Sequence, residues 1–195
     1  SKEYVKALVT SISKNNTLKK NCNIEYIDCL DDKIQIKEYG KDLVVYNKVL
    51  FACHPVEILP ILKSINPALQ SALKKFSREK NIAYTHCDSM QMPKEKKCWS
   101  SWNYLYRKGS EASRVAVTYW MNKLQHINPD IPLFVTLNPV SPIAKEKIYD
   151  MHEFYHPVFD QAAIDGQLAV NEKQGNCHVW FCGAYLRYGF HEDGV

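Results

Sequence analysis

The most explicit catalytic pattern in this sequence is the segment 152–156, which reads H-E-x-x-H. In zinc hydrolases this pattern holds a metal only when a helix places the two histidines one turn apart. Here Pro157 pushes His156 toward extended geometry, and the two aromatic residues between the histidines favour a strand. In a strand, His152 and His156 would lie about 13 Å apart, too far to share one ion. We therefore predict a strand and no metal site.

His86 is a second residue that could handle a proton. It ends a hydrophobic segment and is followed by Cys87 and Asp88. An imidazole can act as an acid or a base near neutral pH, so His86 is our candidate catalytic residue. The alternative is a strand-end histidine that is hydrogen-bonded to the backbone, and the sequence favours that interpretation here and at His54.

Aromatic residues gather between positions 99 and 120. One interpretation is an aromatic wall in an apolar substrate cavity, since pockets are lined mainly by such side chains. The other is core packing plus an interface, because Trp99 and Trp102 would face opposite sides of a strand. The candidate pocket residues are Trp99, Trp102, Tyr104, Tyr119 and Trp120.

The C-terminal segment combines a hydrophobic strand with regularly placed glycines. The strand stops at Gly183, and a loop leads to the hexapeptide 189–194, which reads G-F-H-E-D-G. A glycine after a strand lets the backbone approach a flat or phosphorylated ligand closely. Amides at the start of a following helix can then bind an anion or a polarised carbonyl. The simpler alternative is a glycine turn that leads into an ordinary helix.

The composition sets the frame for these residues. The chain has 195 residues, 46% apolar and 24% charged, which excludes disorder and predicts one domain or slightly more. No stretch reaches the roughly 18 apolar residues of a membrane helix. The net charge of +4 is spread along the chain without a basic stripe, which argues against nucleic acid as a partner. Seven cysteines without a C-x-x-C pair predict buried free thiols and a cytoplasmic protein.

The periodicity of apolar residues predicts the elements that carry these groups. The first half reads as a helix, a hairpin, two more strands and two helices, and the strand at 49–52 looks central because both of its faces are apolar. The middle reads as a mostly antiparallel sheet of four or five strands, followed by a helix and a short strand. The expected helices are 2–14, 56–64, 67–77 and 158–172, and the expected strands are 23–27, 33–37, 43–46, 49–52, 81–87, 99–105, 115–124, 133–140, 147–156 and 177–182.

Four blocks in this order resemble a known family. The C-terminal block, with Phe181-Cys182-Gly183 followed by the hexapeptide 189–194, is similar to the last flavin-binding stretch of flavin-containing amine oxidoreductases. Together with the blocks at 99–104, 117–125 and 133–139, it resembles a bacterial branch of predicted NAD/FAD-binding proteins within that family.

The resemblance implies an α/β flavoprotein of two domains. Residues 1–57 would be part of the FAD-binding domain, residues 58–170 the substrate-binding domain with a mixed, mostly antiparallel sheet and flanking helices, and residues 171–195 the return segment of the FAD-binding domain. The family's N-terminal Rossmann unit has no counterpart here, because no G-x-G-x-x-G spacing exists among the 7 glycines. The chain is thus expected to be a fragment that binds its cofactor weakly without that segment.

The resemblance also implies a cofactor and its contacts. FAD would be held non-covalently, with Gly183 and Ala184 beside the pyrophosphate or ribityl chain and Phe190 beside the isoalloxazine ring. The backbone of His191 and Glu192 would face the pyrimidine edge of that ring. The full set of implied cofactor-binding residues is Gly183, Ala184, Tyr185, Gly189, Phe190, His191 and Glu192.

The implied activity is an FAD-dependent oxidoreductase that removes a hydride from a hydrophobic amine or from an unsaturated, lipid-like substrate. The lysine that several amine oxidases place near the flavin has no match, because the corresponding segment 81–88 offers only His86 and Asp88. The alternative is a non-catalytic remnant or binding module of the same fold.

Overall fold

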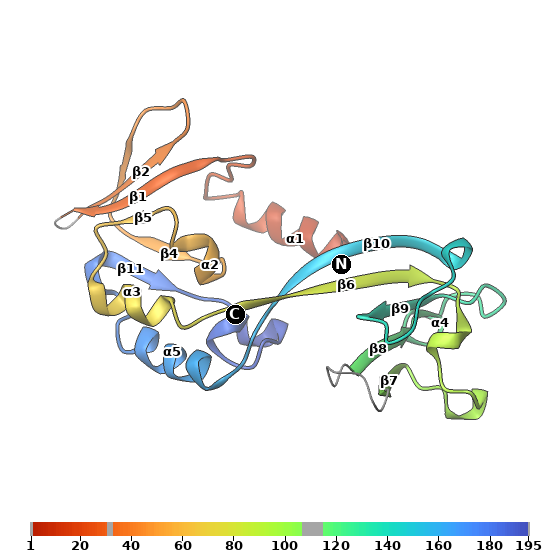
Figure 1. The fold of residues 1–195 in the computed structure, drawn as a ribbon. Helices are drawn as coiled ribbons and strands as arrows, with labels where there is room; N and C mark the ends of the chain where they lie inside the picture. Colours follow the sequence, from red (N-terminus) through yellow and green to blue (C-terminus); the bar gives the residue numbers. More distant parts are fainter. Residues whose placement is uncertain (1, 31–32, 107–114, 195) are drawn as a thin grey trace. The chain divides into compact units, whose positions relative to one another are not determined.

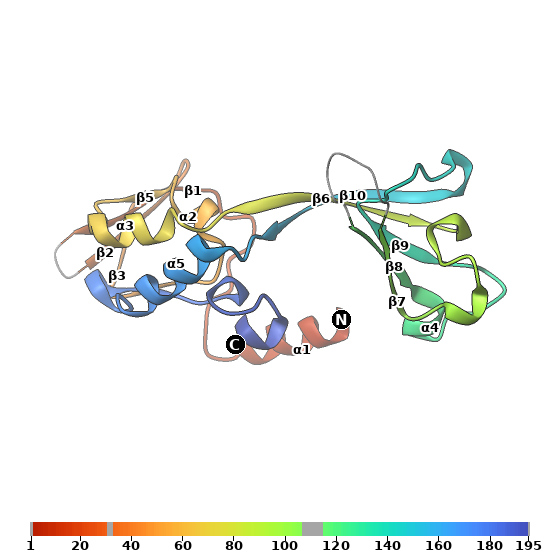
Figure 2. The ribbon, with the colours of Figure 1, turned by 60° about the horizontal axis from the view of Figure 1, so that its bottom comes forward.

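The computed structural model describes residues 2–30, 33–106 and 115–194, and the chain divides into two compact units. Unit 1 combines residues 1–77 with residues 159–195, and unit 2 is formed by residues 78–158. The sequence placed the divisions at 57 and 170 instead. They lie elsewhere because helices α3 (Pro67–Leu73) and α5 (Gln161–Asn171) pack against each other within unit 1 (Figure 2) and bury Leu73 and Val170 there.

Unit 1 contains a four-stranded sheet in the order β3-β2-β1-β5 (Figure 1). Strands β1 (Ile24–Leu30) and β2 (Lys33–Glu38) form the predicted hairpin, and β3 (Val44–Tyr46) continues it in antiparallel fashion. The short β5 (Leu62–Lys63) runs parallel to β1. Alternation of apolar and polar residues therefore predicted the hairpin correctly.

A separate two-stranded parallel sheet joins β4 (Val49–Phe51) to β11 (Val179–Phe181). The prediction that β4 is a central strand was wrong for the part of the chain that the structure describes. Within it, β4 pairs with β11 alone, and Leu50 is 60% exposed.

The helices of unit 1 differ in length from the expectation. Helix α1 (Lys2–Ile12) forms where helical spacing predicted it, but it buries none of its side chains. The helix expected at 56–64 is reduced to α2 (Pro55–Ile58). Pro60 explains the early end, because a proline has no amide hydrogen with which to continue the helical hydrogen bonds, although Leu59 before it still has helical φ and ψ of −53° and −40°.

Unit 2 is a five-stranded antiparallel sheet in the order β10-β6-β9-β8-β7. This confirms the predicted mostly antiparallel sheet. Figure 1 shows β6 and β10 side by side along their length. The strands are β6 (Arg78–His86), β7 (Trp102–Tyr106), β8 (Val115–Trp120), β9 (Phe134–Leu137) and β10 (Ile148–Pro157).

The segment expected to be one strand over 115–124 changes into helix α4 (Met121–Gln125). Asn122 causes the change. Its amide nitrogen donates to the carbonyl oxygens of Asn128 and Ile131 at 2.7 and 2.8 Å, and its Oδ1 accepts from the Leu133 amide at 2.8 Å. One buried side chain thus fixes a turn that strand propensity did not reveal.

Short 3₁₀ helices complete the connections, and no helix in the described ranges is both long and apolar enough to cross a membrane. All seven cysteines are free. The expectation of buried thiols was wrong, since Cys22, Cys53, Cys98 and Cys177 are exposed and the other three are half-buried. The 3₁₀ helices are η1 (Ser89–Gln91), η2 (Lys96–Cys98), η3 (Lys145–Lys147), η4 (Asn176–His178), η5 (Ala184–Leu186) and η6 (His191–Gly194).

Candidate functional site

The C-terminal segment of unit 1 leaves β11 along a path that requires glycine. Gln174 fixes the end of the strand, because its side chain accepts from the Phe181 amide at 2.9 Å and donates to the Phe181 carbonyl at 2.8 Å. Gly183 follows with φ of +143°, and a Cβ at this position would lie 2.8 Å from the ring of Tyr185. A side chain here would be strained by the backbone and blocked by the ring.

The loop after η5 is held in place by two polar side chains. Gln167 of α5 donates to the carbonyl oxygens of Tyr185 and Arg187 at 3.0 and 2.7 Å. Asp193 Oδ2 accepts from the amides of Tyr188 and Phe190 at 3.2 and 3.0 Å. The loop is therefore an ordered structure attached to α5 rather than a plain turn.

This arrangement encloses a small hollow of about 190 Å³ at the end of β11. A Cβ on Gly194 would lie 3.4 Å from the Ala184 nitrogen, so the two glycine-containing stretches meet here. In the described part of the chain, no acceptor bonds the amides of Gly183, Ala184 and Tyr185. The hollow is lined by Asn171, Gln174, Cys182, Gly183, Arg187 and Gly194, among others.

Tyr185 is the buried anchor of this segment. It is 4% exposed, and its ring lies edge-on to His54 and Phe76 with centroids 5.4 and 5.1 Å away. Burial raises the pKa of its phenol well above the ordinary value, and the thiols of Cys182 and Cys53 act in the same direction. The hydroxyl has no hydrogen-bond partner among the residues that the structure describes. The ring of Tyr185 thus belongs to the core, and only its backbone faces the loop.

The remaining predicted cofactor residues lie further along the same loop. Gly189 has φ of +89°, and a Cβ there would lie 2.7 Å from the ring of Phe159. Phe190 is 69% exposed and Glu192 is exposed, while the side chain of His191 lies outside the described residues. The structure brings the backbone of these residues together and leaves the Phe190 ring open to a flat partner.

His86, the candidate proton-handling residue of unit 2, is completely buried. Its Nδ1 accepts from the Asp88 amide at 3.0 Å, so the proton sits on Nε2, which donates to Thr136 Oγ1 at 2.7 Å. Burial lowers the pKa of His86 to about 4, although the charge of Asp88 opposes that shift. Both nitrogens are engaged inside the sheet, and this geometry favours the structural interpretation over the catalytic one.

The five candidate pocket residues do not form one wall. Trp102 pairs with Tyr119 across β7 and β8, and Tyr104 lies on the same face two residues along. Trp102 and Tyr104 are 53% and 65% exposed. Trp120 lies on the opposite face, where Trp99 packs edge-on against it at 5.4 Å. The expectation of a single aromatic cavity is corrected to two groups, because strand alternation separates them.

The H-E-x-x-H segment lies in β10, as the strand prediction requires. His152 and His156 are exposed, and the ring of Phe154 lies between them with centroids 4.7 and 6.1 Å away. Among the described residues, no group of three or more potential ligands surrounds a point where a metal ion could sit. The segment belongs to β10, one of the two edge strands of the sheet in the described part of the chain.

Sequence reasoning missed the polar side chains that order the C-terminal loop. Gln167 donates to carbonyl oxygens 18 and 20 residues away, and Gln174 to one that is 7 residues away. The sequence around both residues predicts only a helix with a polar end. Sequence reasoning also missed a pocket in unit 2 that includes Tyr84 and Lys145. No local motif marks either residue.

Comparisons with known proteins bear on the fold. No family model and no curated protein sequence matches. Among solved structures, the chain resembles a CLA-producing fatty acid isomerase from P. acnes, with a TM-score of 0.61 and 12% identity over 92% of this chain and 46% of that one. It also resembles a putrescine oxidase, with a TM-score of 0.57 and 13% identity over 89% of this chain and 45% of that one.

A third similar structure is the cyclohexylamine oxidase from Brevibacterium oxydans IH-35A, with a TM-score of 0.55 and 9% identity over 88% of this chain and 44% of that one. The fold is of the amine-oxidase type. The chain spans less than half the length of these solved structures. At such identities the likeness concerns the arrangement of the backbone, and the chemistry must be argued from the residues.

Proposed function

We propose that unit 1 supplies part of a non-covalent FAD site and that the full-length protein is an FAD-dependent oxidoreductase. The observation that carries this proposal is the glycine-lined hollow at the end of β11, where the amides of Gly183, Ala184 and Tyr185 have no acceptor among the described residues. Its occurrence in a fold of the amine-oxidase type supports a flavin as the ligand.

The residues of the hollow fit a polar portion of FAD. Gly183 and Gly194 present no side chain, so a pyrophosphate or ribityl oxygen could reach the free amides. Arg187 is among the residues that line the hollow, and a guanidinium suits an anionic group. The exposed ring of Phe190 would lie against the isoalloxazine ring, and the backbone of His191 and Glu192 would face its pyrimidine edge.

When bound, the flavin would supply the acceptance of a hydride from a substrate carbon. This chain would bind and orient both partners. The face of unit 2 that carries Trp102, Tyr104 and Tyr119 is the proposed substrate surface, with Trp99 and Trp120 packing behind it. Such a surface suits a hydrophobic amine or an unsaturated, lipid-like molecule.

A non-catalytic binding module is the second candidate function. It is favoured by His86, whose two nitrogens are both engaged inside the sheet, so that it is not free to exchange a proton with a substrate. The two candidates differ in turnover. A flavoenzyme would consume oxygen or reduce another acceptor when given a hydrophobic amine, whereas a binding module would hold its ligand unchanged.

The experiment that tests the FAD site uses the full-length protein and the substitution Gly183→Ala. The added methyl group would meet the Tyr185 ring at 2.8 Å, and we expect flavin retention to fall by about tenfold or more. Flavin is measured by its visible absorption and by its fluorescence after release from denatured protein. The matched control is Gly40→Ala, at a glycine with φ of +69° that has no atom within 4 Å of the new Cβ.

A colourless full-length protein that gains no flavin on reconstitution would overturn the proposed cofactor. Equal flavin content in the two variants would remove the C-terminal segment from the site.

A further inference from the structure

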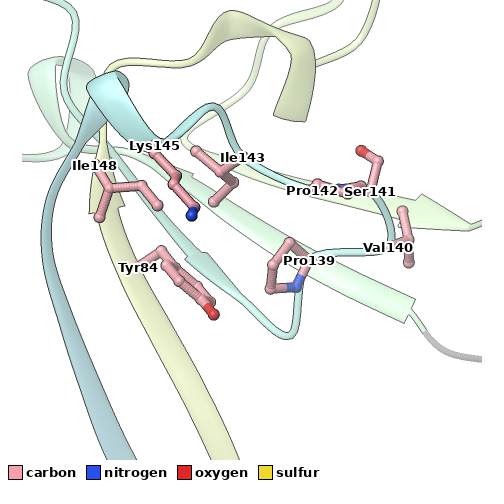
Figure 3. Close-up of a pocket in the computed structure, with 8 residues that line it drawn as sticks. All are labelled: Tyr84, Pro139, Val140, Ser141, Pro142, Ile143, Lys145 and Ile148. Carbon is pink, nitrogen blue, oxygen red and sulfur yellow. The ribbon is translucent and has the colours of Figure 1, made fainter.

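Unit 2 contains a pocket of about 390 Å³ whose lining includes none of the candidate cofactor, catalytic or substrate residues. It lies between β6, the start of β10 and the segment 139–145 that connects β9 to β10. Figure 3 shows Tyr84 forming its floor, with Lys145 reaching inward between Ile143 and Ile148. The volume falls in the range of small-molecule sites. The lining is completed by Pro139, Val140, Ser141 and Pro142.

The connecting segment is held from beneath by buried polar side chains. Gln91 is completely buried, and its amide nitrogen donates to both the carbonyl oxygen and the hydroxyl of Ser141 at 3.2 Å. Asp88 accepts from the Ala144 amide at 3.4 Å and from the Lys147 ammonium at 2.9 Å. The wall of the pocket is therefore tied down at Ser141, Ala144 and Lys147, so that the pocket is preformed.

The start of the segment is fixed as well. Asn138 adopts φ of +48°, its Oδ1 accepts from the Ile82 amide at 3.0 Å, and its amide nitrogen donates to Asn81 Oδ1 at 2.7 Å. Pro139 and Pro142 have rings that restrict φ. Six side-chain hydrogen bonds therefore hold this segment in place, and the proposed FAD site requires none of them.

The charge of the pocket comes from one lysine. Lys147 is neutralised by Asp88, but Lys145 has no carboxylate within ion-pair distance in the described part of the chain. The Tyr84 hydroxyl offers a second donor, and the other walls are mainly apolar. A single ammonium with one hydroxyl suits a compact monoanion, and the lining has no arginine for a bidentate contact with a phosphate dianion.

We propose that this pocket binds a small organic monocarboxylate, whose carboxylate contacts the Lys145 ammonium and the Tyr84 hydroxyl while its apolar body packs against Pro139, Ile143 and Ile148. The proposal does not depend on the FAD site in unit 1. It assigns a class of ligand to a pocket that has no role in the proposed hydride transfer.

The test titrates the ¹⁵N-labelled chain with octanoate and, separately, with octanamide, which has the same apolar body without the charge. Octanoate is expected to bind saturably and to shift the amide signals of Tyr84, Ile143 and Ile148. Octanamide is expected to bind about tenfold more weakly, because it loses a charge-assisted contact. Lys145→Met should weaken octanoate by about tenfold and leave octanamide unchanged.

The matched control is Lys123→Met, which removes a lysine exposed on α4 in the same unit. It should leave both affinities unchanged. Tyr84→Phe should weaken octanoate by about threefold to tenfold, since it removes one hydrogen bond. Equal affinity for octanoate and octanamide, equal effects of the two lysine substitutions, or no saturable shift around the pocket would each overturn the proposal.

Discussion

The two units bury different kinds of side chains. The core of unit 1 is a single apolar cluster in which Ile34, Ile58 and Leu73 have no exposed surface. Apart from Tyr185 of unit 1, the buried side chains with a polar group among the described residues belong to unit 2, namely His86, Asp88, Gln91, Asn103, Thr118, Asn122 and Thr136. Unit 1 is therefore stabilised chiefly by apolar burial, and unit 2 by apolar burial together with a hydrogen-bonded polar network.

The buried polar network of unit 2 should make its stability respond differently from that of unit 1. His86 Nε2 donates to Thr136 Oγ1, and the hydroxyls of Thr136 and Thr118 are hydrogen-bonded to each other at 2.8 Å. A buried polar group that loses its partner keeps its desolvation cost, whereas an apolar core responds mainly to lost volume. The two units should therefore respond differently to substitutions and to pH.

The largest expected effect is in the apolar core. Leu73→Ala removes a fully buried side chain of α3, and we expect the opening free energy of unit 1 to fall by about 3 kcal/mol. Native-state hydrogen exchange, read separately for amides of the two units, measures the effect. Amides of β6 and β9 should keep their protection. An equal loss in both units would show that they unfold together and would remove the basis of the comparison.

The next effect is a pH dependence of unit 2 that comes from His86. The pKa of His86 is lowered from 6.5 to about 4, so the unfolded state takes up a proton at a higher pH than the folded state does. The stability contributed by neutral His86 is therefore fully present above about pH 6.5 and is lost as the pH falls toward 4, amounting to about 3 kcal/mol.

Asp88 acts in the same sense at lower pH. Burial alone would raise its pKa, but Lys147 and the amides of Met90 and Ala144 outweigh that cost and hold the pKa below its usual value. Hydrogen exchange of unit 2 between pH 7 and 4 measures the slope, and His86→Gln should flatten its upper part. A slope of the same size in unit 1 would contradict the assignment to His86.

A smaller effect is expected when the hydrogen-bond chain is broken without a change of shape. Thr136→Val leaves the His86 Nε2 proton without its acceptor, and we expect unit 2 to lose about 1–3 kcal/mol. Urea unfolding followed through the tryptophans, which all lie in unit 2 except Trp180, reports the change. The control is Thr85→Val on the opposite face of β6, which should change stability by less than about 0.5 kcal/mol.

The smallest effect is expected for an ion pair on the surface of unit 2. Lys80 and Glu153 lie 2.6 Å apart with side chains 49% and 46% exposed, so solvent screens their attraction. Lys80→Met should change the stability of unit 2 by less than about 0.5 kcal/mol. A loss as large as that of Thr136→Val would mean that exposed charges, rather than the buried network, distinguish the two units.

The local sequence pattern predicted a helix or strand correctly where no other residue nearby favoured a different structure. Alternation predicted the hairpin of unit 1, and segments of β-branched and aromatic residues predicted the sheet of unit 2. Pro157 and the aromatic residues before it correctly favoured a strand over a helix for the H-E-x-x-H segment. Prediction failed where a second signal overrode the first, as Pro60 did for the helix expected at 56–64 and Asn122 did for the end of β8. Periodicity reports which residues are apolar, but it does not report which tertiary hydrogen bond ends an element.

For the candidate cofactor site in unit 1, the sequence allowed the backbone path to be predicted but not the side chains that hold it. The glycines at 183 and 189 stood out in the sequence, and the structure gives both of them positive φ. The side chains that hold the loop were not predictable, because Gln167 finds its acceptors across the fold. The same holds for the pocket of unit 2, whose members Tyr84 and Lys145 are far apart in the sequence.

The pairing of Arg78 with Pro157 has a consequence for how this architecture can be altered. The chain enters unit 2 and leaves it on neighbouring strands, so the two cut points are adjacent in space. A short linker could join residue 77 directly to residue 159, and a different domain could be inserted at the same two positions. Unit 2 is thus an insertion, which selection or engineering can exchange while the apolar cluster around it keeps its own connectivity.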